Sequence, residues 1–117
     1  MSDRARQKAL KLAYKLAHPP MGLFAIRNLA TGRVFVDRSR NLTGSLNRHR
    51  MELQRGVHRN RELMADWRTF GEAQFAFEVI DRVEARPEPD FDYDAALDDR
   101  LAAWRAGVPP GSPGSYT

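Results

Sequence analysis

The chain has 117 residues, which is enough for one compact domain with its own hydrophobic core but not for two. It contains no cysteine, and this excludes disulfides, thiolate metal sites and cysteine nucleophiles. The N-terminal segment has no continuous apolar run, so we expect neither a signal peptide nor a membrane span. We therefore expect a single-domain cytoplasmic protein that does not contact membranes.

The net charge of +4 is distributed unevenly along the chain. Residues 1–68 contain 15 Lys and Arg and 5 Asp and Glu, whereas residues 72–117 contain 4 and 10, so the two parts carry +10 and −6. A surface of positive charge attracts phosphate backbones and accelerates association with them. The basic part therefore favours a nucleic-acid partner, and the alternative is an ordinary solvated surface.

The first expected elements are a basic helix and a β-hairpin. Over residues 1–20, apolar residues recur at helical spacing and two prolines end the pattern. Two short apolar runs, Leu23–Ile26 and Arg33–Val36, follow on either side of a turn with Gly32, which predicts an antiparallel hairpin. The polar face of the helix presents the cations Arg4, Lys8, Lys11 and Lys15.

Two further helices are expected after the hairpin. Apolar residues at helical spacing predict a helix over residues 41–55, which Gly56 would end. Asn60 is a suitable N-cap for a second helix over residues 60–70, which Gly71 would end. Both helices lie within the basic part of the chain.

The remaining pattern completes an α+β domain over residues 21–107. Alternation of apolar residues predicts a third strand over 75–83, and a last helix is expected over 95–106. Residues 108–117 are rich in Gly, Pro and Ser, so we expect a flexible tail. The predicted fold is a small three-stranded antiparallel sheet flanked by helices, with an extra N-terminal helix.

Short motifs in the predicted hairpin and the following helix can be compared with those of known protein families. Gly22-Leu23-Phe24 lies in the first strand, Phe35-Val36-Asp37 lies in the second, and Asn41-Leu42 and Arg48-His49 follow. In order and spacing, these motifs resemble the GIY-YIG nuclease superfamily over about half of the chain. The positions in register are Gly22, Phe24, Asn28, Gly32, Phe35, Ser39, Asn41, Leu42, His49, Leu53, Gly56, His58, Asn60, Leu63, Asp66, Trp67, Gly71, Phe75 and Phe77.

The resemblance also implies that the catalytic site is degenerate. Members of the family cut phosphodiesters with tyrosines of the two motifs, a nearby histidine, an arginine of the first domain helix and a Mg²⁺-binding glutamate of the last helix. Here the tyrosine positions hold Phe24 and Phe35, which have no hydroxyl. Ser45 stands at the arginine position and Leu101 at the glutamate position. His49 is the main polar group that remains.

We therefore expect a nucleic-acid-binding domain whose nuclease activity is lost or strongly weakened, with DNA as the favoured partner. No bound cofactor is expected, and Mg²⁺ would be needed only by an active site. Arg48 lies one turn from Ser45 and could replace the missing cation in an active enzyme. The expected contact residues are Arg38, Arg40, Arg48, Arg55, Lys8, Lys11 and Lys15.

Two other functions stay open at this point. The first is an active endonuclease rebuilt from His49, Arg48 and a carboxylate of the last helix, with Asp98 and Asp99 as weak metal-ligand candidates. First-turn residues favoured by the helix dipole are the simpler interpretation of both. The second is a protein-interaction module that uses the acidic C-terminal half. His49 could also be an ordinary buried histidine, and His58 is expected to be a loop residue.

Overall fold

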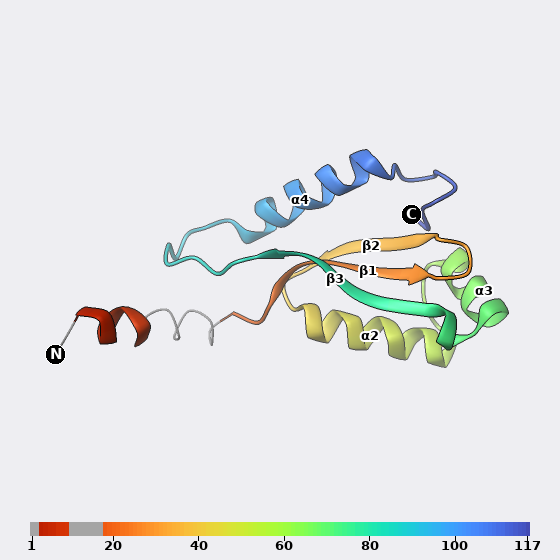
Figure 1. Cartoon of the computed structure of the whole chain (residues 1–117), viewed down its shortest axis with the longest axis horizontal. Helices are drawn as coiled ribbons and strands as arrows, with labels where there is room; N and C mark the ends of the chain where they lie inside the picture. Colours follow the sequence, from red (N-terminus) through yellow and green to blue (C-terminus); the bar gives the residue numbers. More distant parts are fainter. Residues whose placement is uncertain (1–2, 10–17) are drawn as a thin grey trace.

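The computed structural model describes residues 3–9 and 18–117, and it contains a three-stranded antiparallel sheet with helices on both faces (Figure 1). The α+β fold predicted from the sequence is confirmed. The elements in chain order are β1 (Met21–Asn28), β2 (Val34–Ser39), α2 (Leu42–Arg55), α3 (Arg61–Phe70), the short 3₁₀ helix η1 (Glu72–Gln74), β3 (Phe75–Val83) and α4 (Tyr93–Gly107).

The N-terminal helix expected over residues 1–20 is described only in part. Residues 3–9 are helical and exposed, and they include Lys8. Residues 1–2 and 10–17, and with them Lys11 and Lys15, lie outside the described residues. Within the described ranges, no helix is long and apolar enough to cross a membrane.

The sheet has the order β2-β1-β3, and β1 pairs antiparallel with both neighbours. The pairing of β1 with β3 shifts register between Leu23 and Phe24, which is a β-bulge. Gly22 lies just before this bulge, where a Cβ would stand 2.0 Å from the carbonyl oxygen of Asp81. The first motif glycine is therefore required because β3 approaches the backbone of β1 too closely for any side chain.

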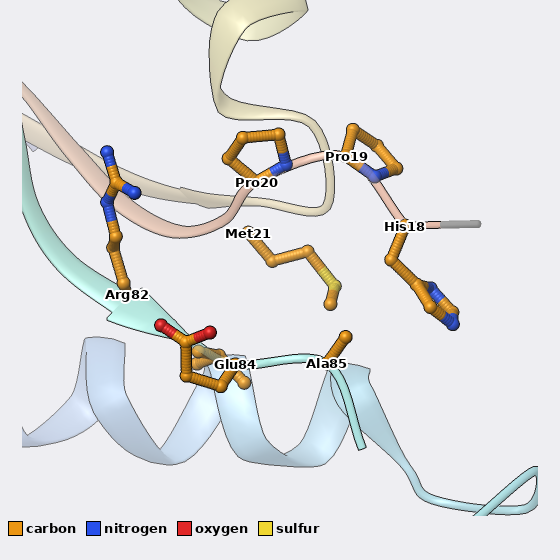
Figure 2. A pocket seen from close by; sticks show the side chains of 8 residues that line it. His18, Pro19, Pro20, Met21, Arg82, Glu84 and Ala85 are labelled. Carbon is orange, nitrogen blue, oxygen red and sulfur yellow. The ribbon is translucent and has the colours of Figure 1, made fainter. Parts of the chain in front are cut away.

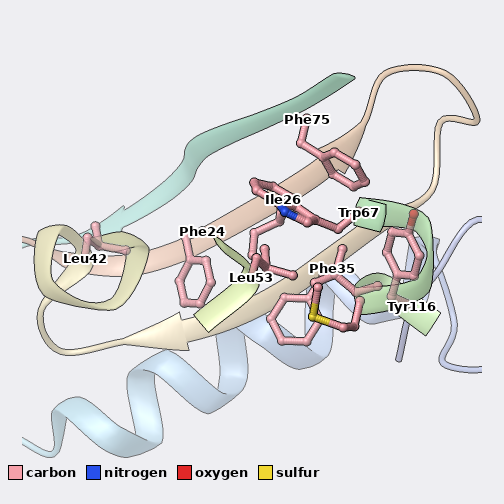
Figure 3. Close-up of a cluster of buried hydrophobic side chains, with 10 residues drawn as sticks. Phe24, Ile26, Phe35, Leu42, Leu53, Trp67, Phe75 and Tyr116 are labelled. Carbon is pink, nitrogen blue, oxygen red and sulfur yellow. The ribbon is translucent and has the colours of Figure 1, made fainter. Parts of the chain in front are cut away.

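Alternation along the strands divides the core into two layers. Phe24 and Ile26 face α2 and α3, and they pack with Phe35 into the larger apolar cluster (Figure 3). Leu23 and Ala25 face the other side of the sheet and pack against α4. The other buried members of the larger cluster are Leu42, Leu53, Leu63, Met64, Trp67, Phe75 and Tyr116.

Capping residues determine where the helices begin and end. The side chains of Asn41 and Asn60 accept hydrogen bonds from the backbone N–H groups of Gly44 and Leu63, at 3.1 and 3.0 Å, and start α2 and α3. The cap at Asn60 is the predicted one. Gly56 ends α2 in the left-handed conformation, with φ of 73°. The last helix begins earlier than predicted because Asp92 is its N-cap.

The end of the chain is packed, whereas a flexible tail is expected from its composition. Tyr116 is 4% exposed, and its backbone N–H donates to the carbonyl oxygen of Val34 at 3.1 Å. The Tyr116 hydroxyl donates to Asp66 at 2.6 Å and accepts from Asn28 at 3.1 Å. The guanidinium of Arg33 lies 4.2 Å from the centre of its ring. A single aromatic side chain with polar partners thus holds the segment in place.

Candidate functional site

Four buried rings meet where β1, β2, α2 and the loop after α2 come together. The centre of the His49 ring lies 5.1 Å from that of Phe24 and 5.4 Å from that of Phe35. His58 lies 5.0 Å from His49 and meets Phe35 edge-on at 5.7 Å. His49 is 3% exposed and His58 6%. We call Phe24, Phe35, His49 and His58 the ring cluster.

Local rules of structure explain why these four residues meet. Ile26 pairs with Phe35 and Phe24 pairs with Asp37, so the two phenylalanines point to the same face of the sheet. His49 lies on the buried stripe of α2, one turn before Leu53. The left-handed turn after α2 then brings His58 back against the helix that it follows.

The two histidines are hydrogen bonded to each other. Nδ1 of His49 lies 2.8 Å from Nε2 of His58. On the other side of the His58 ring, Nδ1 accepts the backbone N–H of Asn60 at 3.1 Å. Three of the four ring nitrogens are therefore engaged within the protein.

Burial keeps both histidines neutral near pH 7. It lowers the pKa of His49 to about 4, and the neighbouring His58 and the cation of Arg48 act in the same direction. Glu52 and Asp37 oppose this shift. Burial also lowers the pKa of His58. Desolvation of the charged imidazole is the main cause in both cases.

Two carboxylates and two arginines lie at the rim of the ring cluster. Arg59 is 4.0 Å from Asp37, which stands where the family motif has glycine. Arg48 is 3.7 Å from Glu52 on the same helix. The side chains of Arg48 and Arg59 are 63% and 77% exposed, so neither cation is fully engaged by these pairs.

The structure places Ser45 one turn before His49 on α2, but it does not bring Leu101 to the ring cluster. The Ser45 hydroxyl is hydrogen bonded to that of Ser39, which in turn accepts the backbone N–H of Asn41 at 2.9 Å. Leu101 is 7% exposed and packs against Leu23 on the other face of the sheet. A side chain at position 101 therefore belongs to the layer under α4, away from His49.

The carboxylates of α4 are engaged by arginines of and next to β2. Arg38 is paired with Asp94 at 3.0 Å and with Asp98 at 2.7 Å, and Arg40 lies 3.9 Å from Asp94. Asp99 is exposed. Across residues 3–9 and 18–117, no three His, Asp or Glu side chains are close enough to hold a metal ion together. Leu101, at the position of the family's glutamate, offers no oxygen ligand for Mg²⁺.

A separate pocket of about 320 Å³ lies between the start of β1 and the end of β3 (Figure 2). None of the expected site residues lines it. Its lining consists of His18, Pro19, Pro20, Met21, Arg82, Val83, Glu84 and Ala85.

The sequence predicts His58 only as a loop residue, and it does not predict that Arg59 and Tyr116 lie near the ring cluster. One feature of the sequence could have placed His58 and Arg59. They lie in the short connection between Gly56, which ends one predicted helix, and Asn60, which caps the next, and so short a connection stays beside the first helix. The composition of the tail contains no comparable signal for Tyr116.

The hairpin, the helices on one face and the third strand with its following helix make up an α+β domain, and the chain has a GIY-YIG-like fold. Two solved structures of one protein, the homing endonuclease I-TevI, are similar to it. Its catalytic domain is 20% identical, with a TM-score of 0.64, over 82% of this chain and 95% of that chain. A point mutant of the same domain is 17% identical, with a TM-score of 0.62, over 76% and 84%. The chain matches no protein family and no curated protein.

Proposed function

We propose that this GIY-YIG-like domain binds nucleic acid, most readily DNA, and that its nuclease activity is lost or strongly weakened. The observation that supports the loss is the ring cluster itself. Where the family has two tyrosine hydroxyls, two phenylalanine rings pack against a pair of neutral, mutually bonded histidines. Phenylalanine keeps the packing of tyrosine but cannot transfer a proton.

Phosphodiester hydrolysis also needs a cation beside the phosphate to stabilise the negative charge that develops in the transition state. Ser45 is neutral and bonded to Ser39, and Leu101 lies in the opposite layer. Loss of one group that acts in the transition state commonly lowers the rate by two or more orders of magnitude. Several such losses together support an inactive or very slow enzyme.

Binding is assigned to the exposed arginines along α2 and the loop that follows it. Arg48, Arg55 and Arg59 are exposed, and all three belong to the basic part of the sequence. Arg38 and Arg40 are paired with α4, so they contribute less than the sequence suggests. Arginine side chains that contact phosphates give affinity without base specificity. We therefore propose sequence-independent binding that weakens steeply with salt.

The binding test compares two double variants of equal charge. Arg48→Glu with Arg55→Glu reverses cations on α2, whereas Arg82→Glu with Arg86→Glu makes the same change in the acidic half. We expect fluorescence anisotropy with a labelled duplex to show a loss of affinity of tenfold or more for the α2 variant and a small loss for the control. Equal losses, or no binding by the wild type at low salt, would contradict the proposal.

Plasmid cleavage in Mg²⁺ or Mn²⁺ tests the catalytic half of the proposal. Wild type should leave supercoiled plasmid intact at micromolar protein. Metal-dependent nicking that disappears in His49→Ala would instead establish a rebuilt active site. In that case Asp37 and Glu52, which act electrostatically on His49, would be better metal-ligand candidates than Asp98 or Asp99.

A further inference from the structure

The hydrogen bonds of the ring cluster determine which nitrogen of each histidine holds the hydrogen. The backbone N–H of Asn60 can only donate, so Nδ1 of His58 is an unprotonated acceptor. A neutral His58 then carries its hydrogen on Nε2, which lies 2.8 Å from Nδ1 of His49 and donates to it. Nδ1 of His49 is therefore an acceptor, and the single hydrogen of that ring lies on Nε2.

The side chain of Asn60 is hydrogen bonded through both its oxygen and its nitrogen. These bonds fix the direction of the hydrogen bonds that run from Asn60 through His58 to His49. Its side-chain oxygen caps α3 by accepting from Leu63, and its side-chain nitrogen donates to the carbonyl oxygen of Tyr116 at 2.7 Å. The N-cap and the packed C-terminal segment together keep its backbone N–H directed at His58. Neither imidazole can reverse without breaking one of these bonds.

The fourth ring nitrogen is Nε2 of His49. It has no hydrogen-bond partner among the described residues. Within the same part of the chain, the buried side-chain nitrogen or oxygen atoms that lack a partner are Arg33 Nε and Arg105 Nε, and Nε2 of His49 is not among them. Although His49 is only 3% exposed, its Nε2 therefore reaches the surface. The exposed Arg48 and Arg59 follow the two histidines in the sequence, and their charges act on His49 and His58 respectively.

We propose that His49 is a neutral hydrogen-bond donor that recognises a phosphate oxygen of the bound strand, with His58 and Asn60 as positioning residues that fix its tautomer. This inference rests on the proposed nucleic-acid-binding function. It also implies that His49 is not a general base, because Nε2 already holds a hydrogen and Nδ1 is occupied by the His58 donor. A neutral donor flanked by arginines suits an anionic oxygen.

Nitrogen-15 NMR of the imidazoles tests the tautomers directly, since the chain contains three histidines. In the wild type at pH 7, His49 and His58 should both show protonated Nε2 and unprotonated Nδ1, with His18 as an internal reference. A charged His49, or one protonated on Nδ1, would overturn the assignment. A short DNA duplex should shift the Nε2 resonance of His49 and leave that of His18 in place.

The same experiment separates this inference from the proposed function. If DNA binds and the α2 arginines respond while His49 Nε2 does not, the recognition role is wrong and the proposed function stands. If DNA does not bind, both fail, although the tautomers can still be measured. A shift by inorganic phosphate as large as that by DNA, at equal phosphate concentration, would show a site for the free ion and would overturn the assignment to a strand.

Two substitutions of His58 then test its positioning role. His58→Gln keeps an N–H donor near Nδ1 of His49, so the Nε2–H tautomer and DNA affinity should be retained within about twofold. His58→Phe removes the donor, and His49 should become a mixture of tautomers with DNA affinity lowered by up to about tenfold, the value of one hydrogen bond. An unchanged tautomer in a folded His58→Phe variant would refute the role.

Discussion

His49 shows how burial changes the protonation of a polar side chain. At the surface it would titrate near neutrality, but between Phe24 and Phe35 it stays uncharged and is bonded to His58. The phenylalanines do not merely remove two hydroxyls. They surround the imidazole with apolar rings, and this lowers its pKa to about 4. Burial among these rings, together with the bond to His58, therefore leaves His49 uncharged at neutral pH.

Stability should decrease as the pH falls through the range in which an unfolded histidine takes up a proton. The pKa of His49 is about 4 in the folded protein and 6.5 as an ordinary value, so the unfolded chain binds more protons between these limits. The stability is complete above about pH 6.5 and is lost progressively toward pH 4, by up to about 3 kcal/mol for His49 alone. Urea unfolding between pH 7.5 and 5.5 measures this decrease.

The control for this effect is His49→Gln, which cannot titrate and should reduce the pH dependence over the same range to the part that His58 contributes. The charged neighbours are Arg48 and Glu52 on α2, Asp37 on β2 and Arg59 in the loop, and the carboxylates titrate mostly below this range. A wild-type profile that is flat between pH 7.5 and 5.5 would show that the histidines are not buried as described.

At the level of elements, the position of α4 decides whether the family's site can be restored by substitution. Leu101 lies in the layer under α4, where it packs with Leu23, Ala25, Val34 and Val36. Leu101→Glu would bury a carboxylate among apolar side chains without bringing it to His49. We expect it to lower the free energy of unfolding by at least about 3 kcal/mol and to create no metal site.

The triple variant Phe24→Tyr, Phe35→Tyr and Ser45→Arg tests this argument by plasmid cleavage. It restores the proton-transfer groups and the cation but no metal ligand, so it should remain inactive in Mg²⁺. Adding Leu101→Glu should give a less stable protein with no gain in cleavage. Robust metal-dependent nicking by the fourfold variant would mean that α4 can move to bring position 101 to the ring cluster.

The C-terminal segment is a second element whose role can be measured. Burial raises the pKa of Tyr116 to about 12, as does its hydrogen bond to Asp66, so the hydroxyl stays a donor at neutral pH. Tyr116→Phe would leave the side-chain amide of Asn28, which is 0% exposed, without this acceptor. We expect a loss of about 1–3 kcal/mol in denaturant unfolding.

Tyr93→Phe is the matched control for Tyr116→Phe. Its hydroxyl accepts the backbone N–H of Arg86 at 2.9 Å, and Arg86 is exposed, so water can replace the lost bond. The loss should be smaller than for Tyr116→Phe. If the two losses are equal, the C-terminal segment contributes no more to stability than an ordinary surface loop.

For the whole molecule, the division of the sequence into a basic and an acidic half is only partly preserved in space. Arg38 and Arg40 come from the basic half, yet they are paired with Asp94 and Asp98 of the acidic half. These pairs join β2 to α4 and neutralise part of the +10 and −6. Arg48, Arg55 and Arg59, on and after α2, stay exposed, whereas Arg38 and Arg40 are less available to a phosphate ligand than the sequence suggests.

The fold was predictable because its signals are local. Strand alternation, the caps Asn41 and Asn60 and the closing Gly56 act within a few residues. The contacts of Tyr116 are not local, since its partners Asn28 and Asp66 are 88 and 50 residues away. Periodicity likewise could not show which face of the sheet α4 covers, and so it could not show that Leu101 lies in the layer opposite to His49.

The two-layer core has a practical consequence, because each layer contains one of the chain's two tryptophans. Trp67 packs against Phe75 at 5.1 Å in the layer under α2 and α3, and Trp104 packs in the layer under α4. Single-tryptophan variants, Trp67→Phe and Trp104→Phe, would report by fluorescence on one layer at a time. Since β1 contributes side chains to both layers, we expect the two unfolding curves to coincide. Separate midpoints would reveal that one side of the sheet can melt while the other persists.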